Sequence, residues 1–289
     1  MKNIRSLIFL SLLALFGCSA DLPSITDCQS NQELNVYCGF TNPEDLALTP
    51  DKKFLIVSEF GGMAPLAEMQ FGQLSLFDID SKTKRDLPIL VGDNLWGDTQ
   101  CSRDHELGFG PHGIDLKQRT DGRWQLAVVS HMPDESIEMF ELVQHDGWAL
   151  EWRGCVKVEG QYYFNDVALT VNGDFYATHM FPKDTSMLKV IYNVFAKSDT
   201  GQVVYWSPKE GLKPLDFTRG SFPNGIALDD DSQQLVVNYN LADQTVLYNL
   251  ATQQAIATYR HNSPDNVVIS EGYVWVANHD HAATDTPHL

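Results

Sequence analysis

The sequence is poor in basic residues. Only 20 Lys and Arg stand against 38 Asp and Glu, which gives a formal net charge of -18. A surface of this sign repels phosphate backbones and does not release counterions from them, so we exclude nucleic acid as a partner. The acidic surplus is typical of a solvated surface and is also compatible with binding of hard cations.

Several catalytic and metal-binding motifs are absent. The five cysteines form no C-x-x-C pair, which argues against a zinc ribbon and a thioredoxin-like redox site. Neither G-x-S-x-G nor H-E-x-x-H occurs, so a nucleophile elbow and a zincin site are not indicated. The string Gly108-Phe109-Gly110-Pro111-His112-Gly113 matches G-x-G-x-x-G, but it precedes an expected strand instead of opening a helix, which excludes a dinucleotide site.

The apolar run at the N-terminus is shorter than a membrane-spanning helix. It covers residues 7–16 and follows two basic residues, whereas a spanning helix needs about 20 residues. We therefore predict a signal peptide over residues 1–17. The motif Leu15-Phe16-Gly17-Cys18 resembles the bacterial lipobox, which makes Cys18 the predicted lipidation site. Ordinary signal cleavage nearby and a retained membrane anchor are the alternatives.

This leader implies export as a lipoprotein of the outer membrane or periplasm, with membrane contact through acyl chains and a tether over residues 18–40. Cys28, Cys38, Cys101 and Cys155 remain, an even number in an oxidising compartment, and they allow three complete pairings. We favour Cys101 with Cys155 and Cys28 with Cys38, because each pairing keeps its partners on the same side of the chain's internal repeats.

Five segments share one pattern, in which a polar pair is followed by an alternating apolar strand, a turn and a second apolar strand. The repeats start at residues 44, 112, 165, 224 and 265, with spacings of 68, 53, 59 and 41 residues. Such alternation, bounded by Gly, Asn, Asp and Pro, is typical of β-hairpins. The spacings are near or above the roughly 40 to 50 residues of a four-stranded propeller blade. We predict an all-β fold, a β-propeller over residues 41–289.

One segment departs from the repeat. Between Phe181 and Ala196 the apolar residues have the spacing of a short amphipathic helix. It is a candidate lid over the channel mouth, a candidate membrane-facing patch, or an ordinary insertion packed on its own blade.

The residues at the start of each repeat converge in a propeller, because the first strand of every blade lines the central channel. A single Asn-Gly or Asp-Asn pair is explained by turn formation. Five repeats with oxygen or imidazole groups at the same phase indicate a site. The converging residues are Glu44, His112, Asn165, Asn224, Asp265 and Asn266.

This donor set suits a hard divalent cation. Its two carboxylates and three amides match the six to eight oxygen ligands of Ca²⁺, and the two negative charges balance one ion. A zinc site would need nitrogen or sulfur donors. Asp45 and Asp166 lie one residue further along their strands, where a second ion could bind together with a backbone carbonyl.

The ordered motifs resemble the calcium-dependent paraoxonase/arylesterase family, six-bladed β-propellers in a wider group with gluconolactonase and strictosidine-synthase-like proteins. The resemblance covers roughly residues 41 to 280. It rests on Pro43-Glu44-Asp45-Leu46, His112-Gly113-Ile114, Val128-Val129-Ser130-His131, Phe164-Asn165-Asp166, Asn224-Gly225-Ile226 and Asp265-Asn266.

The resemblance implies two calcium ions, of which the catalytic one is held by Glu44, Asn165, Asn224, Asp265 and Asn266. The structural ion is held by Asp45, Asp166 and the carbonyl of Ile114. His112 and His131 fall where the family has a histidine pair proposed to activate water; each is otherwise an ordinary hydrogen-bonded core histidine. His279-Asp280-His281 is a polar loop or a weaker transition-metal candidate.

The C-terminal part departs from the family pattern. Only 23 residues follow Asn266, and five channel strands are found where the family has six blades, so the closing blade is expected to be incomplete. A shortened gene product, closure with fewer blades and pairing with another chain are the alternatives.

The favoured function is calcium-dependent hydrolysis of a small ester or lactone, in which the cation polarises the carbonyl and an imidazole deprotonates water. A non-catalytic, calcium-stabilised propeller that binds a ligand or partner is the alternative, as is a sugar lactonase of the gluconolactonase type.

Overall fold

The computed structural model describes residues 28–30, 35–62, 70–104, 106, 108–158, 160 and 162–279. The chain divides into two compact units, Met1–Cys38 and Gly39–Leu289. The second unit begins two residues before the expected start of the propeller. The predicted signal peptide, Cys18, Asp280 and His281 lie outside the described residues.

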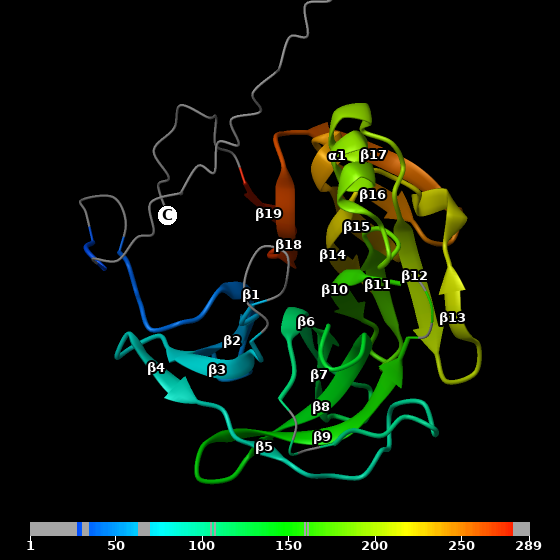
Figure 1. Ribbon diagram of the computed structural model, residues 1–289. Coiled ribbons are helices and arrows are strands. Elements are labelled where there is room, and N and C mark those ends of the chain that lie inside the picture. The colour runs from blue at the N-terminus through cyan, green and yellow to red at the C-terminus, as the bar shows by residue number, and fades with distance from the viewer. Residues whose placement is uncertain are drawn as a thin grey trace, which may run out of the picture. The chain divides into compact units, whose positions relative to one another are not determined.

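Apart from the short strand β5, the second unit is built from antiparallel sheets whose strands follow one another in chain order (Figure 1). The first sheet contains β1 (Pro43–Leu48), β2 (Phe54–Glu59), β3 (Gln73–Asp78) and β4 (Thr83–Asp86). The second contains β6 (Pro111–Gln118), β7 (Trp124–Ser130), β8 (Ser136–Gln144) and β9 (Trp148–Lys157), with β5 (Ile89–Leu90) parallel to β9.

Two further four-stranded sheets and a two-stranded sheet complete the described fold. The third sheet contains β10 (Phe164–Leu169), β11 (Phe175–His179), β12 (Gln202–Ser207) and β13 (Gly211–Pro214). The fourth contains β14 (Pro223–Asp229), β15 (Gln234–Tyr239), β16 (Gln244–Asn249) and β17 (Gln254–Arg260). The fifth is the hairpin of β18 (Pro264–Ser270) and β19 (Tyr273–Asn278). Short 3₁₀ turns lie at Asp216–Thr218 and Asn240–Ala242.

The first strands of the five sheets face a common axis. β1, β6, β10, β14 and β18 contact one another in this order, and the Asn266 side-chain amide donates a 2.7 Å hydrogen bond to the carbonyl of Glu44, which links β18 back to β1. This arrangement confirms the predicted β-propeller. The described residues form four full blades and a hairpin, so they do not reach the six blades that the resemblance implies.

Every strand pair predicted from alternation is present, and each first strand extends back over its polar residues. The turn of the last hairpin is an example of the local geometry. Ser270 pairs with Tyr273, which leaves Glu271 and Gly272 as a two-residue loop with φ of 53° and 77°. Positive φ at both positions is the requirement of the tightest hairpin turns, and glycine meets it without a Cβ penalty.

The core lies between neighbouring sheets in three clusters. In the second cluster, Trp206 is 1% exposed and stacks on Phe175 with ring centroids 5.2 Å apart. Burying a side chain of this size contributes about 2 to 3 kcal/mol to stability. The fifth sheet is different, because Trp275 remains 61% exposed. The described hairpin has no outer strands against which this face could pack.

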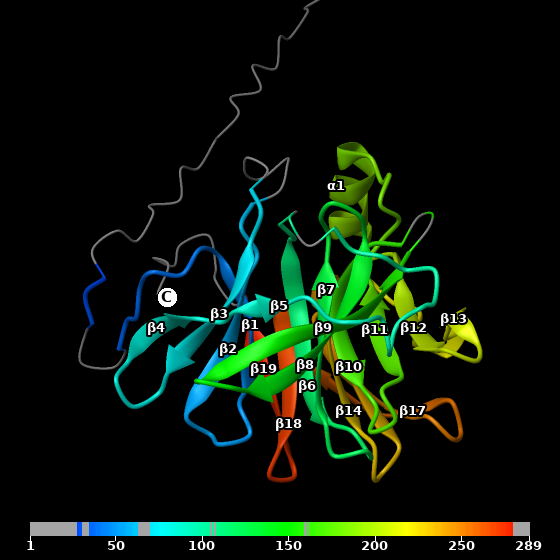
Figure 2. The ribbon, with the colours of Figure 1, turned by 90° about the horizontal axis from the view of Figure 1, so that it is seen from below.

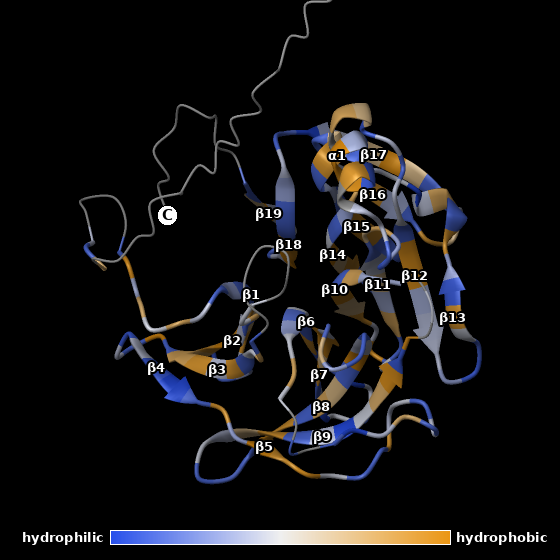
Figure 3. Cartoon of the chain, viewed as in Figure 1, coloured by the Kyte–Doolittle hydropathy of each residue, from blue (hydrophilic) through white to orange (hydrophobic). Residues whose placement is uncertain are grey.

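The predicted helix is present as α1 (Met187–Ala196). The Ser186 side chain accepts a hydrogen bond from the Lys189 N–H, and Lys197 ends the helix in the left-handed conformation. α1 lies beyond the end of the axis at which the first strands begin, opposite the β18–β19 turn (Figure 2). Much of the helix consists of apolar residues (Figure 3), of which Leu188 and Phe195 are 80% and 84% exposed.

Both favoured disulfides are confirmed, Cys28–Cys38 in the first unit and Cys101–Cys155 in the second. The latter ties the segment after β5 to β9. Two disulfides indicate an extracellular or periplasmic protein. Among the described helices, none is long and apolar enough to cross a membrane.

Candidate metal centre and histidine pair

All five first strands change register where the predicted site residues lie. The shifts fall between Pro43 and Asp45, Pro111 and Ile114, Phe164 and Val167, Pro223 and Ile226, and Pro264 and Val267. A bulge frees a residue from the ladder and redirects its side chain. The residues inside the five bulges include Glu44, His112, Asn165, Asn224, Asp265 and Asn266.

Four of these residues carry a buried oxygen without a hydrogen-bond donor among the described residues. They are Glu44 Oε2, Asn165 Oδ1, Asn224 Oδ1 and Asn266 Oδ1, one from each of four first strands. An unsatisfied buried acceptor costs about 1 to 3 kcal/mol, so four of them at one end of the channel call for a shared positive partner. Oxygen donors of carboxylate and amide type fit Ca²⁺.

Asp265, the fifth predicted ligand of the catalytic ion, is paired with a histidine. Its Oδ2 lies 2.9 Å from His279 Nε2, and this hydrogen bond raises the pKa of His279. The Asp265 carboxylate also acts on Glu44, whose pKa it helps to raise. It therefore belongs to the same electrostatic cluster as the four unpartnered oxygens.

Three largely enclosed carboxylates in this cluster are costly to ionise. Burial, followed by repulsion from Asp45, Asp166 and Asp265, raises the pKa of Glu44 well above its ordinary value. Burial raises the pKa of Asp45 to about 7 and that of Asp166 well above the usual range. No described Lys or Arg forms an ion pair with any of the three. A divalent cation would offset this repulsion.

The residues predicted for the second ion form a deeper layer. Asp45 Oδ2 accepts the Ile114 N–H at 2.7 Å, and its Oδ1 accepts the Leu46 N–H at 2.7 Å. Asp166 accepts the N–H groups of Ile226 and Val167 in the same way. Both carboxylates thus tie one blade to the next. The structure brings Asp45 and Ile114 into contact, while the second ion itself stays a prediction.

The centre is not a cluster of charged ligands alone. Among the described residues, no group of three or more His, Cys, Asp or Glu side chains is arranged to hold a metal. Asparagine amides supply three of the four unpartnered oxygens. The donor set therefore favours a hard oxygen-binding cation over zinc.

The two predicted histidines lie side by side, with ring centroids 5.0 Å apart. His112 Nδ1 is 2.8 Å from the carbonyl oxygen of Asn165, so Nδ1 carries the proton. Its Nε2 lies 3.5 Å from Glu44 Oε1. Burial, and then the neighbouring His131, lowers the pKa of His112 to about 3. His112 is therefore a neutral imidazole between two predicted calcium ligands.

His131, directly after β7, is held from the other side. Its Nδ1 lies 3.0 and 3.1 Å from the two carboxylate oxygens of Glu135, and its ring stacks on Tyr163 with centroids 4.5 Å apart. Nε2 of His131 is buried and has no partner in the described part of the chain.

Aromatic rings continue from the histidines towards the surface. Phe60 packs edge-on against His112 and His131, at 5.2 and 5.7 Å between centroids. Tyr163 contacts Phe181, and Phe181 contacts Phe222, each pair at 5.3 Å. The histidine pair is therefore bordered by an apolar wall.

Sequence patterns identified the bulged residues but missed Glu135 and Tyr163. Glu135 lies in the loop between β7 and β8, and no repeat phase or motif spacing marks it. The sequence also contains a signal for the bulges themselves. A proline precedes four of the five, at Pro43, Pro111, Pro223 and Pro264.

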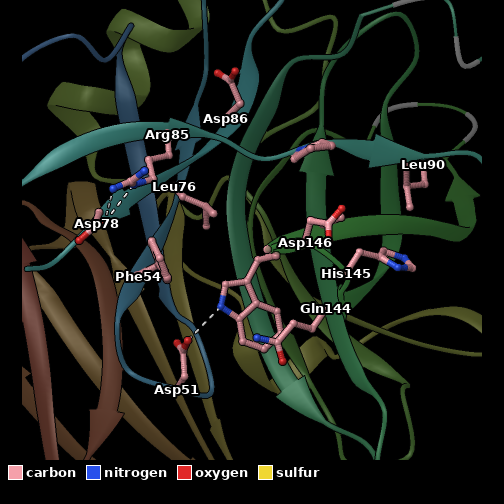
Figure 4. A pocket seen from close by; sticks show the side chains of 14 residues that line it. Asp51, Phe54, Leu76, Asp78, Arg85, Asp86, Leu90, Gln144, His145 and Asp146 are labelled. Carbon is pink, nitrogen blue, oxygen red and sulfur yellow. Dashed lines mark hydrogen bonds and ion pairs between the residues drawn. The ribbon is translucent and has the colours of Figure 1, made fainter. Parts of the chain in front are cut away.

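A separate groove of about 860 Å³ lies between the first and second sheets (Figure 4). Phe54, Leu76 and Trp148 line it together with several acidic side chains, and the Trp148 indole donates a 3.3 Å hydrogen bond to Asp51. This groove contains none of the predicted site residues. The channel remains the candidate site, because the four unpartnered oxygens belong to the first strands that line it.

A family model described as Arylesterase matches residues 32–283. The chain belongs to the arylesterase family. The match spans all five bulges and both histidines, and it confirms the resemblance drawn from the ordered motifs. Membership supports a hydrolase built on a propeller.

Among solved structures, the nidogen/laminin complex has a TM-score of 0.53 at 13% identity, covering 84% of this chain and 75% of that chain. This likeness shows the propeller fold. A luciferin-regenerating enzyme gives a TM-score of 0.48 at 14% identity, covering 83% of this chain and 69% of that chain. A gluconolactonase described as putative gives 0.45 at 16% identity, with 82% and 72% covered. No curated protein matches this arylesterase-family chain.

Proposed function

We propose that the chain is a calcium-dependent hydrolase of small esters or lactones. The observation that carries the proposal is the set of four buried, unpartnered oxygens from Glu44, Asn165, Asn224 and Asn266. These residues, with Asp265, would hold the ion. When bound there, Ca²⁺ supplies a Lewis acid that polarises a substrate carbonyl and stabilises the developing oxyanion.

The residues of the chain would do the remaining work. The His112 ring is fixed by its hydrogen bond to the Asn165 carbonyl. Because this ring is neutral, it does not repel a cation bound beside it. The adjacent imidazole of His131 has a buried nitrogen that can accept a proton from water. No covalent nucleophile is required.

The apolar wall of Phe60, Tyr163, Phe181 and Phe222 suits a substrate with an aromatic or aliphatic leaving or acyl group. We further propose that the protein is exported and anchored through lipid on Cys18. Two disulfides support an exported protein, while the anchor is tested separately by mass spectrometry of the mature N-terminus.

The test is hydrolysis of phenyl acetate and of a medium-chain γ-lactone, first with Ca²⁺ and then with excess EGTA. We expect turnover of at least one substrate, loss with EGTA and recovery on adding Ca²⁺. A rise in melting temperature with Ca²⁺ but no turnover would contradict the hydrolase and favour the non-catalytic binding propeller. Turnover of sugar lactones alone would favour the gluconolactonase type.

A further inference from the structure

Glu135 is a buried carboxylate outside the proposed ligand set. It is 3% exposed and lies in the loop between β7 and β8. Its Oε1 accepts the Phe164 N–H at 2.8 Å, which fixes the carboxylate against the start of β10. Both of its oxygens also face His131 Nδ1, at 3.0 and 3.1 Å.

This contact determines the tautomer of His131. An ionised carboxylate can only accept hydrogen bonds, so the nitrogen between its two oxygens must carry a proton. The neutral ring then has its lone pair on Nε2, the buried nitrogen without a partner among the described residues. The same logic applies when a carboxylate orients a catalytic or metal-bound histidine.

We infer that Glu135 is a positioning residue, which holds His131 with Nε2 ready to take a proton from the attacking water. This inference rests on the proposed hydrolase function. Nε2 takes the proton while the water oxygen bonds to the substrate carbonyl carbon. The imidazolium, stabilised by the Glu135 charge, later returns the proton to the departing alkoxide as the ester bond breaks.

The surroundings favour His131 over His112 in this role. His112 has a predicted calcium ligand at each nitrogen, the Asn165 carbonyl at Nδ1 and Glu44 at Nε2. His131 has a buried carboxylate behind it instead. The other charged or titratable groups that face the pair are Lys183, 3.7 Å from Glu135 Oε2, together with His112, Tyr163 and His179.

The experiment compares Glu135→Gln with Glu138→Gln in the full protein. Glu138 is a matched control because it is also buried, accepts hydrogen bonds from Trp152 and Ser136, and has a basic partner, Arg103 at 3.5 Å, but it does not contact His131. We expect Glu135→Gln to lower kcat by about 10- to 100-fold with KM unchanged. The acid limb of its kcat/KM profile should move to lower pH, because the imidazolium loses its anionic neighbour.

Glu138→Gln should stay within about threefold of the wild type and keep its pH profile, since it removes no contact to the histidine. Equal losses in the two variants would overturn the proposal. So would a loss in Glu135→Gln that leaves the acid limb in place, because a purely structural role predicts that result.

The ring ¹⁵N shifts of His131, assigned with a His131→Asn variant, give a readout that needs no turnover. We expect the Nδ1–H form in the wild type and a larger share of the Nε2–H form in Glu135→Gln, because the glutamine amide can also donate to Nδ1. An Nε2–H form in the wild type would overturn the proposal. An inactive wild type with the Nδ1–H form would reject the hydrolase while supporting the Glu135–His131 pairing.

Discussion

Adjacent residues on the first strands differ in whether their side-chain oxygens have hydrogen-bond donors. Glu44 and Asn165 form an outer layer with buried oxygens that lack donors, whereas Asp45 and Asp166 form an inner layer whose oxygens accept backbone N–H groups of their own and the next blade. The register shift at each first strand separates the two layers. Binding of the proposed catalytic ion and blade-to-blade cohesion are therefore assigned to adjacent positions, and substitutions should separate the two properties.

The largest effect is expected in the outer layer. Asn224→Ala removes one unpartnered oxygen and should reduce calcium-dependent hydrolysis by at least about 100-fold, because a metal ligand is lost. The melting temperature in EGTA should stay close to that of the wild type. The control is Asn172→Ala, in an exposed turn. Wild-type turnover in Asn224→Ala would contradict the ligand assignment.

The inner layer should show the reverse. Asp115 belongs with Asp45 and Asp166 because it also accepts a backbone N–H of the next blade, that of Leu169 at 2.7 Å, but it is not a proposed ligand. Asp115→Ala leaves that buried N–H unsatisfied, so we expect the free energy of unfolding, measured with urea in EGTA, to fall by about 1 to 3 kcal/mol. Calcium dependence of the remaining activity should be unchanged. If stability stays the same but calcium affinity falls, the two layers are not distinct.

The smallest expected effect is the pH dependence of the calcium-free protein. Asp45 has a folded-state pKa of about 7, above its unfolded value, so the folded state binds more protons between these two values. Stability is then fully present in acid and falls as pH rises towards 7. The melting temperature in EGTA should drop by a few degrees between pH 5 and pH 8.

Calcium should reverse this trend, with a stabilisation that is larger at pH 8 than at pH 5, because ligand carboxylates must be ionised to bind. Thermal melts at both pH values, with and without the ion, check the expectation. A calcium effect that is equal at both pH values would argue against buried carboxylate ligands.

Alternation and turn residues predicted the hairpins because each blade repeats one local pattern. The same pattern located the candidate site, since Asn224 and Asp265 recur at one phase of it. The prolines mark where four of the bulges fall, but the geometry of the bulges could not be predicted, because it depends on how neighbouring first strands approach. Gly113 shows this, since a Cβ there would lie 2.4 Å from Asp166 Oδ1. Only the folded channel reveals that contact.

Glu135 was also beyond sequence reasoning. It shares the loop between β7 and β8 with His131, and the same carboxylate must also accept the Phe164 N–H from another blade. This carboxylate therefore joins two segments, the β7–β8 loop and β10, and no repeat phase marks its position. Tertiary packing, and not local pattern, sets the orientation of the histidine pair.

The most direct measurement is calorimetric titration of EGTA-treated, dialysed protein with Ca²⁺, for the wild type, Asn224→Ala and Asp115→Ala. The account predicts binding of at least one ion by the wild type and by Asp115→Ala, and its loss in Asn224→Ala. Absence of binding to the folded wild type, or undiminished binding to Asn224→Ala, would contradict the claim that the unpartnered oxygens form a calcium site.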